Sequence, residues 1–137
     1  MSKVTAAVVK NTRNITLEEK GASTVCTQGN IMDLTAGLAV DATSGSTTAT
    51  IRGICNQTIA AAEALTQVPL IIPGEDDTFV VDSTNASNIT HNGQAMVIGA
   101  NAHTINNTGT TSASGVVVQV GVFGASSDNK IVVRFIK

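Results

Sequence analysis

The fold is decided by the stretch VVVQVGVFGASSDNKIVVRFI, residues 116–136. It contains two segments rich in Val and Ile, whose branching at Cβ stiffens χ1 and favours extended backbone over helix. Between them lie Ser126 to Asn129, whose residue types form turns because their side chains bond the local backbone. The stretch therefore predicts a β-hairpin, with strands at 116–123 and 130–136.

Similar short apolar segments recur upstream, and each is closed by residues that form turns. They lie at 23–28, 38–42, 48–57, 68–72, 78–81 and 95–99. Short strands that follow one another at intervals of about 10 to 15 residues are typical of a β-sandwich or barrel. No internal repeat is visible, so the sequence predicts one all-β domain.

Three segments depart from this pattern. The segment IAAAEALTQ, residues 59–67, has helix propensity and predicts one short helical connector. The stretch at 103–115 is poor in apolar residues and predicts a long exposed loop. Residues 1–20 predict an extended N-terminal arm with at most a short strand at 14–20, which leaves 21–137 as a single β-barrel domain.

Composition and charge exclude several classes of function. Charged residues make up 13% of the chain, about half the share usual in soluble domains. A surface rich in uncharged Thr, Ser, Asn and Gly suits protein contact, because no ion is desolvated when it is covered. The net charge of −2 and the scattered basic residues argue against nucleic acid as a partner. No apolar run has the about 20 residues of a membrane span, and Met1 to Val4 do not begin a signal peptide, so synthesis in a cytoplasm is expected.

The chemistry-bearing residues do not form a catalytic pattern. His91 and His103 are the only histidines, both fall in predicted loops, and no nucleophile motif accompanies them. The acids at 75–77 follow Pro73-Gly74 and predict a solvated turn, so we expect neither a metal nor another cofactor. Without Trp or Tyr, a carbohydrate-binding module lacks its stacking platform. Cys26 and Cys55 are expected to be free buried thiols, with a disulfide between them left open.

The central stretch at 49–82 carries a family resemblance. It contains Ile51-Arg52-Gly53-Ile54, then an Ala-rich connector, an apolar segment at 68–72, the turn at Pro73-Gly74, and a second apolar segment at 78–81. This order resembles a pattern of tailed-phage capsid decoration proteins, also called cement or head-stabilising proteins. The run from Gly29 to Ala42 resembles the opening of the same family, with Asn30 where an Asp is common.

The resemblance implies a fold, a function and partners. The fold is a small β-barrel or β-tulip of short antiparallel strands. The function is structural: such a protein binds the outer surface of a phage capsid in the virion and stabilises the shell, and the family offers no catalytic residues. The implied partners are the major capsid protein and further copies of the chain itself, commonly as a homotrimer.

Two sets of contact residues follow as hypotheses. In the first, the arm adds an edge strand to the capsid protein, because strand addition satisfies open backbone groups. The residues concerned are Lys3, Val4, Ala6, Val8, Val9 and Lys10. The alternative is that residues 3–10 form the first strand of the barrel itself. In the second, uncharged loops meet around a threefold axis, through Asn88, His91, His103 and Asn106.

A different virion part remains an alternative. A tail-tube, baseplate or fibre-associated β subunit shares the Thr/Gly/Val composition of this chain. Fibre segments usually show repeats, which this sequence lacks.

Overall fold

The computed structural model describes residues 7–8, 14–21, 23–61, 67–108 and 114–137. Within them the regular secondary structure is almost entirely strand, as the sequence predicts. The strands are β1 (Ala7–Val8), β2 (Ile15–Glu19), β3 (Ile31–Thr35), β4 (Leu38–Asp41), β5 (Ile51–Cys55), β6 (Gln67–Ile71), β7 (Phe79–Ser83), β8 (Ala95–Ile98), β9 (Thr104–Asn106), β10 (Val117–Val122) and β11 (Lys130–Phe135). Two short 3-10 turns, η1 (Ile89–His91) and η2 (Ser126–Asp128), complete the described elements.

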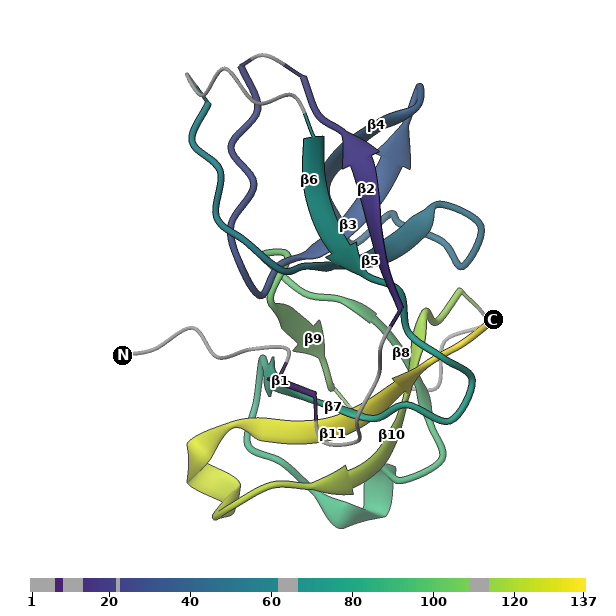
Figure 1. Ribbon diagram of the computed structural model, residues 1–137. Coiled ribbons are helices and arrows are strands. Elements are labelled where there is room, and N and C mark those ends of the chain that lie inside the picture. Colours follow the sequence, from purple (N-terminus) through teal and green to yellow (C-terminus); the bar gives the residue numbers. More distant parts are fainter. Residues whose placement is uncertain (1–6, 9–13, 22, 62–66, 109–113) are drawn as a thin grey trace.

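The second half of the chain forms a closed five-stranded barrel, which occupies the lower part of Figure 1. Its strand order is β7-β11-β10-β8-β9, with antiparallel neighbours. The barrel closes where β9 pairs with β7 in parallel, through Asp82 with Thr104 and Ser83 with Ile105. The remaining part of the same β7 edge pairs with β1, whose Ala7 lies opposite Val80.

The first half forms a second five-stranded sheet, in the upper part of Figure 1. Its order is β2-β6-β5-β3-β4, and all its neighbouring strands are antiparallel. A single parallel bridge between Lys20 and Ala39 joins the two outer strands, β2 and β4. The predicted boundary at residue 20 therefore falls within this sheet, and residues 15–20 belong to its body.

The two halves share one connectivity. When the five strands of each half are numbered along the chain, their order across the sheet is 1-5-4-2-3 in both halves. In both halves a parallel contact also joins strand 3 to strand 1. The ladders match pair by pair. Thr16–Leu70 corresponds to Phe79–Val133, Cys55–Leu70 to Gln119–Val133, Met32–Gly53 to Met96–Val117, Leu34–Ala39 to Ile98–Ile105, and Lys20–Ala39 to Ser83–Ile105.

A second local feature supports this correspondence. The second strand of each half follows a glycine in the left-handed region, Gly29 with φ 92° and Gly93 with φ 88°. Glycine adopts this backbone without the steric cost that a Cβ atom imposes. The structure thus contains an internal duplication that is not visible in the sequence.

The core joins the halves. One apolar cluster combines Ile31 and Ile54 from the first sheet with the barrel interior, where Phe79 and Phe135 meet edge to face at 5.7 Å between ring centroids. A smaller cluster, which includes Met32, Cys55 and Leu70, is formed by residues of the first sheet and its connections. Because the larger cluster draws on both sheets, the described chain packs as one body. Both cysteines are free and buried in the smaller cluster.

Most predicted strands are confirmed, and three details differ. The segment at 23–28 is not a strand, because only Cys26 is paired, in an isolated bridge with Ile59. The strand β3 was not predicted. The predicted loop at 103–115 is wrong where β9 forms, since Ile105 is fully buried. The predicted helix at 59–67 falls mainly on residues 62–66, which lie outside the described residues.

Candidate functional site

The predicted arm contacts are described only in part. Ala7 and Val8 form β1 and pair antiparallel with β7 of the same chain. For these two residues, the pairing corresponds to the alternative in which the segment is a strand of the domain. The other predicted contacts, Lys3, Val4, Ala6, Val9 and Lys10, lie outside the described residues.

The four predicted oligomer contacts fall into two groups. Asn88 caps η1, where its Oδ1 accepts hydrogen bonds from the Thr90 amide at 2.9 Å and the Thr90 hydroxyl at 2.8 Å; His91 ends the same turn. His103 and Asn106 instead lie at the two ends of β9. Within the described part of the chain, no hydrogen bond or ion pair joins one group to the other. The predicted contacts therefore lie on two different elements, one pair at η1 and the other pair at β9.

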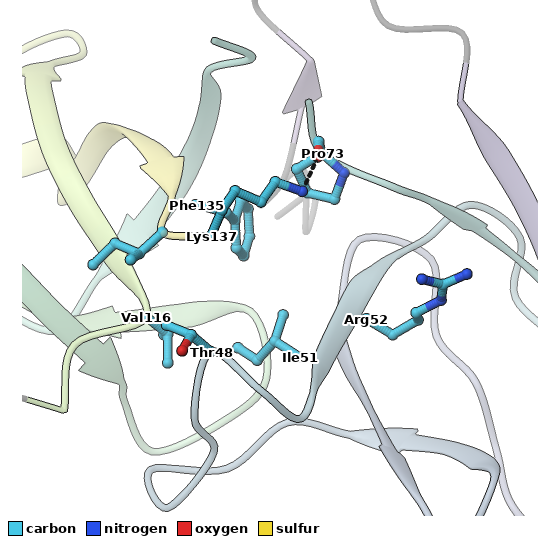
Figure 2. Close-up of a pocket in the computed structure, with 8 residues that line it drawn as sticks. Thr48, Ile51, Arg52, Pro73, Val116, Phe135 and Lys137 are labelled. Atoms are coloured by element: carbon cyan, nitrogen blue, oxygen red, sulfur yellow. Dashed lines mark hydrogen bonds between the residues drawn. The ribbon is translucent and has the colours of Figure 1, made fainter. Parts of the chain in front are cut away.

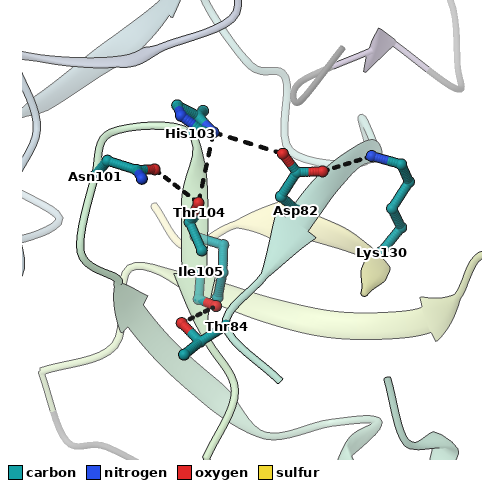
Figure 3. A network of polar contacts seen from close by, with 7 residues as sticks. All are labelled: Asp82, Thr84, Asn101, His103, Thr104, Ile105 and Lys130. Atoms are coloured by element: carbon teal, nitrogen blue, oxygen red, sulfur yellow. Dashed lines mark hydrogen bonds and ion pairs between the residues drawn. The ribbon is translucent and has the colours of Figure 1, made fainter. Parts of the chain in front are cut away.

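His103 belongs to a polar network that ties three strands together at the barrel closure (Figure 3). Asp82 on β7 accepts a charged hydrogen bond from Lys130 on β11, and its second oxygen lies 3.5 Å from His103 Nδ1. The Thr104 hydroxyl donates to Asn101 Oδ1 at 2.7 Å, so its proton is not directed at the imidazole. The arrangement holds β9 against β7, and it lacks an activated nucleophile.

A cleft of about 210 Å³ lies between the sheets (Figure 2). Its two cations are already engaged. Arg52 Nε pairs with Glu18 Oε2 at 2.7 Å, and Lys137 Nζ donates to the Pro73 carbonyl. The lining residues are Thr48, Ile51, Arg52, Pro73, Val116, Phe135, Ile136 and Lys137. The side chains of these residues offer neither a carboxylate nor an imidazole for proton transfer.

Exposed apolar side chains gather at two places. The first is the outer strand β2, where Ile15 is 46% and Leu17 59% exposed; we call this strand margin the β2 edge. The second is the β10 end, formed by Val120, Val122 and Phe123, with Phe123 52% exposed. At the β10 end a bulge between Gln119 and Gly121 leaves Val120 outside the ladder with β11.

The β2 edge also presents open backbone groups. The Asn14 carbonyl accepts from the Ile72 amide at 2.8 Å, so Asn14 faces β6. In an antiparallel ladder the direction of the backbone groups alternates along the strand. The amides and carbonyls of Ile15 and Leu17 therefore point away from β6, and no strand among the described residues pairs with them there.

The charges near this edge are unevenly balanced. Glu18 is compensated by Arg52, whereas exposed Glu19 accepts a hydrogen bond from the neutral amide of Gln67 at 2.9 Å. The edge thus combines an apolar face, unpaired peptide groups and one negative charge at its end. Sequence reasoning placed residues 14–20 in the arm and missed this edge, because the alternation of ITLEE does not reveal which side of the strand stays uncovered.

Two kinds of site are not found among the described residues. They contain no group of three or more His, Cys, Asp or Glu side chains arranged for a metal ion. They also contain no helix long and apolar enough to cross a bilayer. The acids near Pro73 form a turn, in which Asp77 Oδ2 accepts from the Gly74 amide at 2.8 Å.

Comparison of the sequence with models of protein families and with curated proteins finds no match.

Proposed function

We propose that this chain is a structural virion protein that binds the outer surface of a phage capsid and stabilises the shell. The observation that carries the proposal is the β2 edge: an exposed apolar strand with open peptide groups on a small all-β body. Such an edge binds an extended segment of another protein without special chemistry. A cement protein works in this way, because it gains its effect by joining neighbouring shell subunits.

The family resemblance supports the same function. The segment at 49–82 contains β5, β6 and most of β7, so the resemblance covers two of the three inner strands of the first sheet and the crossing into the barrel. Packing explains why this segment has a glycine at position 53. A Cβ atom at Gly53 would lie 2.4 Å from the backbone oxygen of Ile71, so only glycine allows this close approach of β5 to β6.

Under this proposal the partners are the major capsid protein and further copies of the chain in a homotrimer. The turn η1 is the best placed of the predicted oligomer contacts, because Ile89 between Asn88 and His91 is 66% exposed. Gln119 holds the turn in place by donating to the Asn88 carbonyl at 2.9 Å. The arm residues 3–10 remain a second candidate for contact with the shell.

Electron microscopy of particles with and without this protein tests the function. Density that protrudes from the outside of the shell supports decoration, and density on the tail favours the alternative of a tail or baseplate subunit. Binding of a variant that lacks residues 1–12 to undecorated shells then tests the arm. If the folded deletion variant binds with unchanged affinity, the arm is not the contact. Light scattering of the protein bound to and released from shells measures its oligomeric state.

A further inference from the structure

The internal duplication shows which part of the fold is uncovered. In the barrel, the first strand β7 has β11 on one side, while its other side is shared by β9 and β1. In the first sheet, the equivalent strand β2 has β6 on one side and only the Lys20–Ala39 bridge on the other. A counterpart of β1 is missing from β2 among the described residues.

The missing neighbour can be placed residue by residue. Thr16 corresponds to Phe79 and Leu17 to Val80, because Thr16 pairs with Leu70 as Phe79 pairs with Val133. Val80 lies opposite Ala7 of β1 and is 6% exposed, whereas Leu17 has no such neighbour and is 59% exposed. The backbone direction agrees. The Ser83 amide donates a hydrogen bond to the Asn129 carbonyl at 2.8 Å, so Ser83 faces the β11 side of β7. Because the direction of the backbone groups alternates along a strand, Val80, like Leu17, faces the other side.

We propose that the β2 edge receives an extended segment of the capsid shell protein, which runs antiparallel to β2 and becomes the sixth strand of the first sheet. The inference rests on the proposed function for the identity of the partner. The duplication supports the direction of the segment, since β1 runs antiparallel to the equivalent strand. With the added segment, the first sheet has six strands, as many as the barrel sheet has with β1.

The edge specifies the chemistry of that segment. The incoming segment carries apolar residues at alternate positions, and these residues cover Ile15 and Leu17 of the β2 edge. A basic side chain lies at the end next to Glu19, whose charge has no cationic partner among the described residues. Peptide groups of the segment exchange hydrogen bonds with the outward amide and carbonyl of Leu17.

Two variants and a matched control test this contact on undecorated shells of the tailed phage whose genome encodes the chain. Leu17→Pro removes the outward amide proton and the apolar leucine side chain, and Leu17→Ser removes the leucine side chain alone. Leu38→Ser is the control, because Leu38 is an exposed apolar residue, at 38%, on the other outer strand of the same sheet. Leu17→Pro is expected to weaken shell binding by about tenfold or more, Leu17→Ser by less, and Leu38→Ser not at all.

Hydrogen exchange gives a direct readout on the wild-type protein. Amides of residues 14–20 are expected to exchange more slowly on shells than in the free protein. Unchanged exchange there, or normal shell binding by both Leu17 variants, overturns the inference and leaves the proposed function intact. Failure of the wild-type protein to bind shells overturns the proposed function, and the named partner with it. Should Leu17→Pro not fold, Leu17→Ser and the exchange measurement still decide the matter.

Discussion

At Gly53 the backbone of β5 passes close to β6, and a Cβ atom would lie 2.4 Å from the carbonyl oxygen of Ile71. The obstacle is backbone, which cannot rotate away as a side chain would. Gly53→Ala is therefore expected to lower the free energy of unfolding by about 1–3 kcal/mol, as overpacking does. Urea unfolding measures the change.

The control for this substitution is Gly45→Ala. The nearest atom to a Cβ at Gly45 is Thr43 Oγ1, at 3.8 Å, which is ordinary contact. This variant is expected to unfold within about 0.5 kcal/mol of the wild type, as surface substitutions do. Equal effects at Gly53 and Gly45 would contradict the close-approach explanation.

The buried thiol of Cys55 makes stability depend on pH in the alkaline range. Burial raises the pKa of Cys55 from 9.0 to about 11, and burial also raises the pKa of Cys26. A raised pKa means that folding favours the protonated thiol. The stabilisation that the protonated Cys55 thiol gives the folded state is complete below pH 9 and is lost as the pH rises from 9 to 11. The free energy of unfolding is expected to fall there by at most about 1.4 kcal/mol per pH unit for each thiol.

Chemical unfolding at pH 8, 9, 10 and 11 measures this slope, and Cys55→Ala reduces it. The chain contains no tyrosine, so no phenol titrates in the same window. A variant that keeps the full slope would show that another group causes the loss. At pH 8 the native thiols are also expected to resist alkylation until the protein unfolds.

The alternation of backbone groups along β2 can be tested with proline, which lacks an amide proton. The amide of Leu17 points away from β6, whereas that of Thr16 points towards it. Leu17→Pro is expected to cost less than about 1 kcal/mol, and Thr16→Pro about 3 kcal/mol, because only the latter breaks a ladder bond. Thermal unfolding followed by circular dichroism compares the two. The reverse order would mean that the outward side of β2 is assigned to the wrong residues.

Local sequence was enough for strands whose apolar residues are dense. The segments around β5, β6, β7, β8, β10 and β11 all read correctly. It failed for β3, because Asp33 interrupts the pattern; in the fold this carboxylate is buried and accepts a hydrogen bond from the Ser46 hydroxyl. It failed for β9 as well, since Ile105 is the one apolar residue of a strand set among Thr and Asn. Partners distant in sequence stabilise both strands.

The shared core makes the whole molecule a single folding unit. Ile54 belongs to the first sheet, is 1% exposed, and packs in the cluster that fills the barrel. Ile54→Ala is expected to lower the free energy of unfolding by about 2–5 kcal/mol. The opening free energy obtained from hydrogen exchange of the slowest amides in β11 is expected to fall by the same amount, although β11 lies in the other sheet.

The matched control is Ile89→Ala, which removes a side chain that is 66% exposed and is expected to leave both quantities unchanged. If Ile54→Ala accelerates exchange in the first sheet alone, the two halves unfold independently. The prediction depends on the larger cluster being continuous across both sheets.

The duplication and the β2 edge could not be predicted because they are properties of the assembled chain. Most of the matched positions hold unlike residues, such as Ala39 and Ile105 or Cys55 and Gln119, and the few identical ones, such as Met32 and Met96, are too sparse to reveal the shared geometry. The open side of β2 depends on which distant strands pair with it. The local sequence of residues 14–20 does not determine that pairing.

The pairing of β1 with β7 has a consequence for the order of events during synthesis. Translation produces Ala7 and Val8 early, yet their partners Phe79 and Val80 leave the ribosome only after the whole first sheet. A nascent chain folds from its N-terminal side as it emerges. The strand β1 is thus made before every strand of the first sheet but docks after them, and its pairing with β7 joins residues 7–8 to the barrel.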